Sequence, residues 1–159
     1  MTQRPLIIRQ ATSDDADRVG ELAKQFANYL RSLGDTADFK FDKAAYLRDG
    51  FGSRPAFSGV VAEMDAEVIG YLLYHSGYDT DRGERLLYVV DLYVEERFRG
   101  RGAGRALMEE AAAIGKREGA SALIWTVYFA NLDASEFYRR IGARHVKGLD
   151  IMYLEIDSQ

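Results

Sequence analysis

The chain has 159 residues, of which 47% are hydrophobic and 29% are charged, a composition that excludes an intrinsically disordered chain. Its 21 basic and 25 acidic side chains give a formal net charge of −4, so no overall positive field favours nucleic acid or an anionic membrane. The chain contains no cysteine, which excludes disulfides, thiolate metal ligands and a cysteine nucleophile. We expect one domain, residues 1–159, in the cytoplasm, because no apolar run is long enough for a secretory leader or a membrane span.

The first third of the chain predicts a short strand and two helices. The strand covers residues 6–9. Ser13 and the two aspartates after it are typical of a helix N-terminus, and Gly34 of a helix end. Between them, apolar residues recur every three or four positions and form a face expected in the core: Ala16, Val19, Leu22, Ala23, Phe26, Leu30 and Leu33. A second helix is expected over residues 43–48, before glycines and a proline interrupt regular structure.

Three strands are expected in the middle of the chain. Residues 57–62 and 68–75 are rich in β-branched and aromatic residues and flank a short polar turn, which predicts a hairpin. Residues 86–94 form the third and most apolar strand. Consecutive strands joined by short turns pair in the antiparallel sense, so we expect the first half of the sheet to be antiparallel.

The last third alternates helices and strands. Residues 103–114 show helical periodicity, residues 122–128 predict a strand, and residues 132–141 predict a helix that ends at Gly142. Residues 146–156 predict a last strand pair or one bent strand. The expected order is β-α-α-β-β-β-α-β-α-β, an α/β fold whose mixed sheet is parallel across the last two crossovers.

The turn from Glu95 to Arg105 (EERFRGRGAGR) is the most informative segment, because three alternate glycines lie between an apolar strand and a helix. Without Cβ atoms, its main-chain amides can approach an anion closely, and the helix N-terminus adds its positive end. Positive side chains follow along the turn: Arg97, Arg99, Arg101 and Arg105. We therefore expect a pyrophosphate site.

Two other phosphate-binding motifs do not fit this turn. The dinucleotide fingerprint G-x-G-x-x-G fails because Arg105 stands where the third glycine is required. A Walker loop needs Gly-Lys followed by Ser or Thr, which occurs nowhere in the chain. Nucleoside triphosphate hydrolysis is thus disfavoured.

The glycine turn resembles a motif of the GNAT superfamily of N-acetyltransferases, R/Q-x-x-G-x-G/A, through Arg99 to Gly104. Residues 8–15 (IRQATSDD) resemble the superfamily's opening segment, and residues 131–143 resemble its second acetyl-CoA motif. The resemblance covers nearly the whole chain. It is closest to the spermidine/spermine (diamine) N-acetyltransferase branch, which three further segments resemble: residues 47–55, Tyr78 with Asp79, and residues 86–88.

This resemblance implies the GNAT fold, in which two neighbouring parallel strands splay apart and the pantetheine arm of acetyl-CoA lies between them. The main chain of Leu92, Tyr93 and Val94 would bind the pantetheine amides. The pyrophosphate would be bound by main-chain amides of the turn: Arg99, Gly100, Arg101, Gly102, Ala103, Gly104 and Arg105. Asn131 would also contact the cofactor, although an asparagine at this position can equally cap the following helix.

The resemblance also implies the activity and its acid. Tyr138 matches the tyrosine that donates to the sulfur of coenzyme A while an amine attacks the thioester, although an aromatic residue on a helix can also serve packing alone. The acceptor would be a primary amine of a small diamine, polyamine or lysine-like molecule. Acetylation of a protein N-terminus or side chain, and a non-catalytic acyl-CoA-binding regulatory module, are the alternatives. Members of the branch are often homodimers, so we expect a second copy as a partner.

The chain departs from the branch at Val90, where a glutamate often serves as base or binds the amine. Deprotonating a lysine-like amine with a pKa near 10.4 costs about 4.6 kcal/mol at pH 7, so a base is still needed. Asp91 is adjacent, but strand alternation places it on the opposite face from position 90, and a structural role is as plausible as a catalytic one. Another carboxylate, a water chain or an amine of lower pKa would otherwise be required.

Other polar residues carry weaker indications. Four aspartates in expected loops are candidates to flank an amine pocket, although loop carboxylates are more often simply solvated: Asp35, Asp38, Asp79 and Asp81. The two histidines, His75 and His145, are too sparse to indicate a metal site, so we expect no metal.

Overall fold

The computed structural model describes residues 5–156. Its helices and strands follow one another as β1 (Leu6–Gln10), α1 (Ala16–Ser32), α2 (Lys43–Phe51), β2 (Ser58–Met64), β3 (Glu67–Asp79), β4 (Glu84–Val94), α3 (Ala103–Arg117), β5 (Ala120–Ile124) and α4 (Leu132–Arg140). Single-turn 3-10 helices η1 (Ser13–Asp15) and η2 (Glu96–Phe98) precede α1 and α3. Both ends of the expected domain, residues 1–4 and 157–159, lie outside the described residues, so its boundaries stay a prediction.

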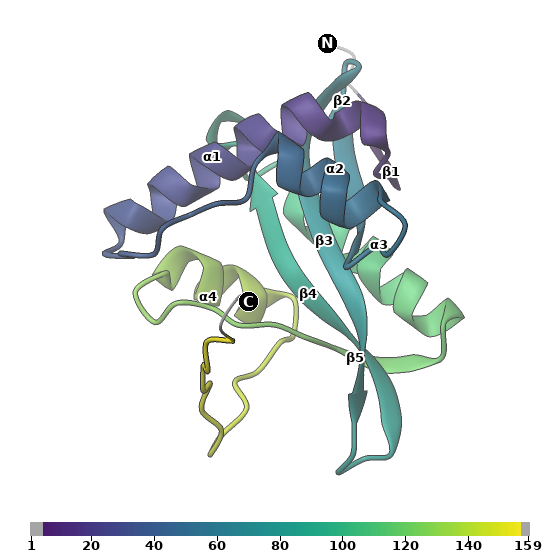
Figure 1. Ribbon diagram of the computed structural model, residues 1–159, viewed down its shortest axis with the longest axis vertical. Helices are drawn as coiled ribbons and strands as arrows, with labels where there is room; N and C mark the ends of the chain where they lie inside the picture. The colour runs from purple at the N-terminus through teal and green to yellow at the C-terminus, as the bar shows by residue number, and fades with distance from the viewer. Residues whose placement is uncertain (1–4, 157–159) are drawn as a thin grey trace.

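The five strands form one sheet in the order β1-β2-β3-β4-β5. Strands β1 to β4 are antiparallel, and β5 runs parallel to β4 after the crossover through α3. Figure 1 shows α1 and α2 in front of the sheet and α3 behind it. The expected α/β fold with a mixed sheet is confirmed.

Local signals in the sequence place most element ends within a few residues. The β2–β3 connection is a two-residue turn in which Asp65 and Ala66 have φ of 54° and 62°, the left-handed geometry typical of a tight hairpin. The predicted cap at Ser13 is wrong by one residue, because the cap of η1 is Thr12. The buried Asp15 carboxylate accepts a hydrogen bond from the Thr12 amide at 2.8 Å and is also held by Arg9 at 2.8 and 2.9 Å.

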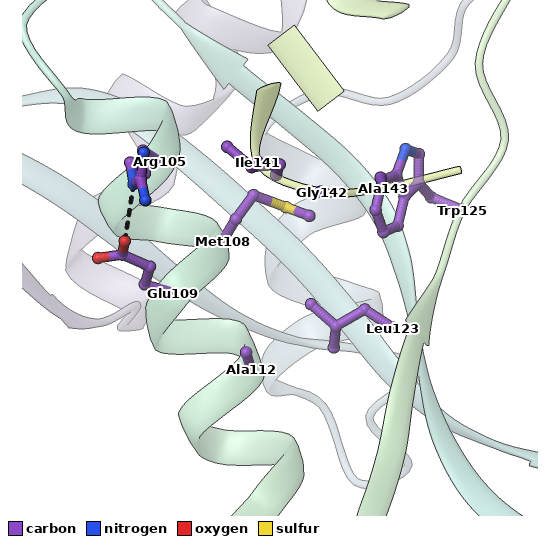
Figure 2. Close-up of a pocket in the computed structure, with 9 residues that line it drawn as sticks. All are labelled: Arg105, Met108, Glu109, Ala112, Leu123, Trp125, Ile141, Gly142 and Ala143. Carbon is purple, nitrogen blue, oxygen red and sulfur yellow. Dashed lines mark hydrogen bonds and ion pairs between the residues drawn. The ribbon is translucent and has the colours of Figure 1, made fainter. Parts of the chain in front are cut away.

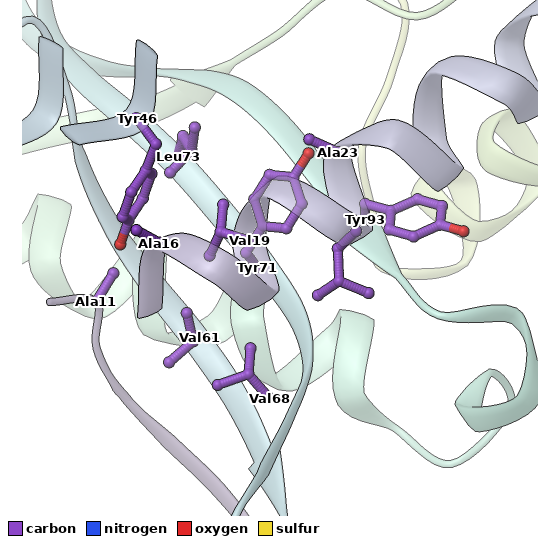
Figure 3. Packing of buried hydrophobic residues seen from close by; sticks show 11 residues of the cluster. Ala11, Ala16, Val19, Ala23, Tyr46, Val61, Val68, Tyr71, Leu73 and Tyr93 are labelled. Carbon is purple, nitrogen blue, oxygen red and sulfur yellow. The ribbon is translucent and has the colours of Figure 1, made fainter. Parts of the chain in front are cut away.

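Each face of the sheet has its own apolar core. The face covered by α1 and α2 buries the expected helix stripe against β2, β3 and β4, as seen in Figure 3. On this face Tyr71 is fully buried. On the other face, Leu107 and Met108 of α3 pack against Val89 and Val94 of β4.

Strands β4 and β5 separate as the resemblance implied. They pair only where Arg85–Tyr88 face Ala120–Ile124, and among the described residues no strand pairs with that edge of β4 from Val89 to Val94. Strand β5 ends four residues earlier than the sequence predicted. The result is an opening lined on one side by the main chain of β4.

The predicted last strand is absent from the described structure. Residues 146–156 form neither helix nor strand, and their large apolar side chains are 54–94% exposed. A strand needs a partner edge for its amides, and within the described chain residues 146–156 pair with no strand of the sheet. In Figure 1 the segment leaves the end of α4 and runs along the outside of the fold. The second parallel crossover that we expected is therefore wrong for the chain as described.

Candidate functional site

The glycine turn has a left-handed backbone at two of its glycines. Gly100 and Gly102 have φ of 73° and 86°, in the left-handed region that disfavours side chains. A Cβ atom at either position would meet nothing within 4 Å, so the turn is open on this side. Gly104 differs, because a Cβ there would lie 3.3 Å from the Phe137 ring, which indicates close helix packing.

The main-chain amides of this turn are available to a ligand. Within the described part of the chain, the amides of residues 100–105 donate to no main-chain carbonyl and to no side chain. They include the first amides of α3, which no preceding turn of helix can satisfy. A run of unpaired amides at the positive end of a helix fits an anionic group such as a pyrophosphate.

The arginines of the turn behave differently from the expected ring of positive charge. Arg99 turns inward, donates from Nε to the Val94 carbonyl at 2.9 Å, and lies over the rings of two tyrosines. Arg97 pairs with Glu95 and Glu67, and Arg105 pairs with Glu109 at 2.9 Å. Arg99 and Arg101 have no carboxylate partner among residues 5–156, and the guanidinium of Arg101 lies 5.7 Å from the centre of the Phe98 ring. The unpaired main-chain amides are therefore the main groups of the turn available to an anion, and the arginine side chains are secondary.

The edge of β4 continues this polar lining into the sheet. Leu92, Tyr93 and Val94 pair with β3 on one side, and their other edge faces the opening beside β5. The Val94 carbonyl already accepts from Arg99, so that one acceptor is partly used. Unpaired main-chain groups of an interior strand are unusual because they normally bond to a neighbour.

A hollow of about 290 Å³ adjoins the turn, between α3, β5 and the end of α4. Figure 2 shows Arg105 and its partner Glu109 at one side of it and Trp125 at the other. Its floor is apolar, with Met108 and Leu123 among the lining residues. An elongated molecule that touches the turn through a phosphate can extend into this hollow.

Tyr138 lies on α4 and packs against the core on the α3 face of the sheet. Its ring packs against Trp125 and Phe137, with centroid distances of 4.8 and 5.2 Å. Burial, with a smaller contribution from the charge of Asp91, raises the pKa of Tyr138 to about 12. The phenol is therefore protonated at neutral pH and can donate a hydrogen bond.

Strand β4 contains a β-bulge that the sequence did not reveal. Tyr74 of β3 faces Val89 and Leu73 faces Asp91, which leaves Val90 as the extra residue. The alternation of side chains is therefore broken at Val90, and the expectation that alternation places Asp91 on the opposite face from position 90 is wrong. Asp91 lies opposite Leu73 on the α1 face of the sheet, and burial raises the pKa of Asp91 to about 7.

Asn131 is used as a helix cap. Its Oδ1 accepts from the Ala134 amide at 3.2 Å and from the Tyr29 hydroxyl at 3.1 Å, and the side chain is buried. This bond ties α4 to α1 beside Arg99, whose guanidinium lies over the same Tyr29 ring. A contact between Asn131 and the cofactor stays a prediction.

The loop aspartates are not brought together. Asp35 bonds to Tyr128 before α4 and Asp38 pairs with Lys40. Asp79 and Asp81 lie at the tip of the β3–β4 hairpin, and the seven-residue step from Glu84 to Asp91 along β4 spans about 23 Å. The hairpin tip is therefore remote from Tyr138 and Asp91.

The described residues contain neither a metal-binding cluster nor a membrane-spanning helix. No group of three or more histidines and carboxylates within residues 5–156 is close enough to hold a metal ion. None of the described helices has the length and hydropathy that crossing a membrane requires.

Comparison with known proteins identifies the family. The acetyltransferase (GNAT) family profile matches residues 21–143. The chain is 31% identical to the thialysine N-epsilon-acetyltransferase of Bos taurus over 147 residues, 87% of this chain and 84% of that protein. It is 28% identical to spermidine/spermine N(1)-acetyltransferase-like protein 1 of Homo sapiens, over 86% of this chain and 20% of that longer protein.

Solved structures agree with these sequence matches. An integron cassette protein of V. cholerae has a TM-score of 0.77 and 26% identity, covering 96% of this chain and 93% of that one. The open amides of the glycine turn and the separation of β4 from β5 thus occur in a chain whose relatives are acetyltransferases. The protein belongs to the acetyltransferase (GNAT) family and is an N-acetyltransferase, whose acetyl donor is acetyl-CoA.

Proposed function

We propose that the enzyme acetylates a primary amine of a small diamine, polyamine or lysine-like molecule. One observation supports the donor site above all: among residues 5–156 the amides of residues 100–105 are unpaired, and so is the edge of β4 that faces away from β3 from Val89 to Val94. The acceptor class is supported by two relatives, whose names state thialysine and spermidine/spermine acetylation.

The residues present fit acetyl-CoA. The amides of residues 100–105 would bind its pyrophosphate, the edge of β4 at Leu92, Tyr93 and Val94 would bind its pantetheine amides, and the hollow beside Arg105 would take a further part of it. When bound, it supplies the reactive thioester.

Tyr138 would act at the sulfur. A thiol has a pKa of about 8.5, about 3.5 units below that of the buried phenol, so complete proton transfer to the thiolate would cost about 5 kcal/mol. We therefore assign Tyr138 the role of a hydrogen-bond donor to the developing negative charge. This interaction strengthens as charge develops, which is the condition for acceleration of the chemical step.

We further propose that the enzyme is a homodimer held in part by residues 146–156. Seven large apolar side chains of this segment are mostly exposed: Val146, Leu149, Ile151, Met152, Tyr153, Leu154 and Ile156. At roughly 100 Å² each they expose about 700 Å² per chain, or about 1,400 Å² for two copies, which is within the size of stable interfaces. Exposed apolar area of this extent is typical of an interaction site.

Two measurements test these proposals. Release of free thiol from acetyl-CoA should require an amine, and a panel of diamines, polyamines, lysine analogues and peptide N-termini should show the first three classes as substrates. Release with peptides alone would replace the proposed acceptor class, and no release with any amine would refute the proposed activity. Sedimentation should give a dimer that Ile151→Lys dissociates, whereas a monomeric wild-type chain would refute the proposed assembly.

A further inference from the structure

Asp91 is a carboxylate without an internal partner. Among residues 5–156 it makes no hydrogen bond and no ion pair, although its side chain is only partly accessible. A few residues away, the fully buried hydroxyl of Tyr71 also has no hydrogen-bond partner in the described chain. Unpaired buried polar groups are costly, so two of them in one region are not explained by stability.

The strand register places these groups on one face of the sheet. Leu73 faces Asp91 and Tyr71 faces Tyr93, so Asp91 and Tyr71 are diagonal neighbours on adjacent strands. The charge of Asp91 contributes to the raised pKa of both Tyr71 and Tyr138, which indicates that both phenols lie near it. Asp91 therefore lies on the α1 face of the sheet, within electrostatic range of the phenol of Tyr138 on α4.

Among residues 5–156, no cationic side chain pairs with Asp91. The titratable groups that face it are Tyr71 from β3, Tyr138 from α4, and Tyr93, two residues farther along β4. Arg99 lies over the Tyr93 ring and does not bond to Asp91. Burial alone sets its protonation, with a pKa of about 7. A cationic amine is the partner that such a carboxylate lacks.

We propose that Asp91 is the catalytic base, which binds the ammonium group of the acceptor and removes a proton from it. The assignment rests on the proposed acetylation of amines. Asp91 would serve as the base that the resemblance assigned to a glutamate at position 90. The bulge at Val90 is what turns Asp91 to the α1 face.

The proposed reaction moves two protons from the acceptor nitrogen. The acceptor ammonium gives one proton to the Asp91 carboxylate, and the neutral nitrogen forms a bond to the acetyl carbon. The bond between that carbon and sulfur breaks, and the nitrogen's second proton ends on the sulfur, which Tyr138 stabilises by a hydrogen bond. Asp91 later loses its proton to solvent. While Asp91 is neutral, the negative charge that weakens Tyr138 as a donor is absent, so the two residues assist each other.

The test compares the wild type with Asp91→Asn and Asp91→Glu, and with Asp14→Asn in η1 as an exposed control. Thiol release with a lysine-like amine is measured from pH 6 to 9.5. For the wild type, kcat/KM should rise with an apparent pKa near 7 and then level off, because the carboxylate is ionised. Asp91→Asn should lose about 100-fold at pH 7 and regain about tenfold per pH unit, following the neutral amine.

Asp91→Glu should keep a levelled profile, and Asp14→Asn should match the wild type. A second readout needs no turnover: the wild type should lose stability to urea between pH 5 and 9 relative to Asp91→Asn. Parallel rate profiles for the wild type and Asp91→Asn, with thiol release intact, would overturn the assignment while leaving the proposed acetylation in place. No thiol release from the wild type or from any variant at any pH would instead refute the proposed acetylation.

Discussion

The pH dependence of unfolding of wild type and Asp91→Asn is the most direct measure of the unusual carboxyl group. In the folded protein burial raises the pKa of Asp91 to about 7, whereas an unfolded aspartate titrates near 3.9. Between these values the folded state holds a proton that the unfolded state has lost. The stability that the folded protein gains from protonated Asp91 is therefore fully present below pH 4 and is lost as pH rises through 7.

The magnitude follows from the difference in pKa. About three units at 1.36 kcal/mol each give about 4 kcal/mol over the full range, and about 3 kcal/mol falls between pH 5 and 9. That is a large part of the 5–15 kcal/mol typical of a domain. Asparagine has nearly the same shape and does not titrate, so the variant should lack this dependence.

Urea unfolding of both proteins at half-unit steps of pH measures the difference. Subtracting the two curves cancels every group that they share, which isolates Asp91. The difference should fall by about 3 kcal/mol as pH rises from 5 to about 7 and should then stay nearly constant up to pH 9. A constant difference would show that Asp91 is already ionised at pH 5 and would refute the inference drawn from its burial.

Four substitutions test other parts of the site. Gly102→Glu puts a side chain at φ of 86° and a negative charge beside the amides, so the thermal shift with coenzyme A should vanish in a folded protein; an unchanged shift would place the cofactor elsewhere. Tyr138→Phe should lower kcat about 100-fold with little change in cofactor affinity; full activity would leave Tyr138 a packing role. Tyr71→Phe removes an unpaired buried hydroxyl and should stabilise the protein by about 1 kcal/mol in urea unfolding; a loss of stability would reveal an unrecognised partner. Val90→Glu adds a like charge beside Asp91 and should move the rising limb of the rate profile to higher pH; an unmoved limb would show that the two carboxylates do not interact.

Much of the fold follows from local patterns in the sequence. The apolar repeat from Ala16 to Leu30 predicted α1 and its buried face, because apolar residues that recur every three or four positions lie on one side of a helix. The alternate glycines predicted a turn with accessible main-chain amides before α3, and Gly100 and Gly102 have the left-handed φ values that disfavour side chains. Both signals are short-range, so tertiary contacts did not alter them.

Long-range pairing was harder to predict. Residues 146–156 have the composition of a buried strand, yet a strand forms only where an edge is available, and the sequence does not say which edge. The arginines of the turn show the same limitation at the level of side chains. Arg99 bonds to the carbonyl of Val94 and Arg105 to Glu109, because neighbouring acceptors compete with any ligand for their donors.

The bulge at Val90 unites these observations. A single extra residue reverses which face each later side chain occupies, and nothing in a run of apolar residues such as Leu86–Val94 marks where it will fall. Val90 itself is 42% exposed, while Val89 packs toward α3 and Asp91 faces α1. The valine at the position where the resemblance implied a glutamate and the orientation of Asp91 are thus linked: Val90, which cannot act as a base, is the bulged residue, and its neighbour Asp91 is a carboxylate with no partner among residues 5–156.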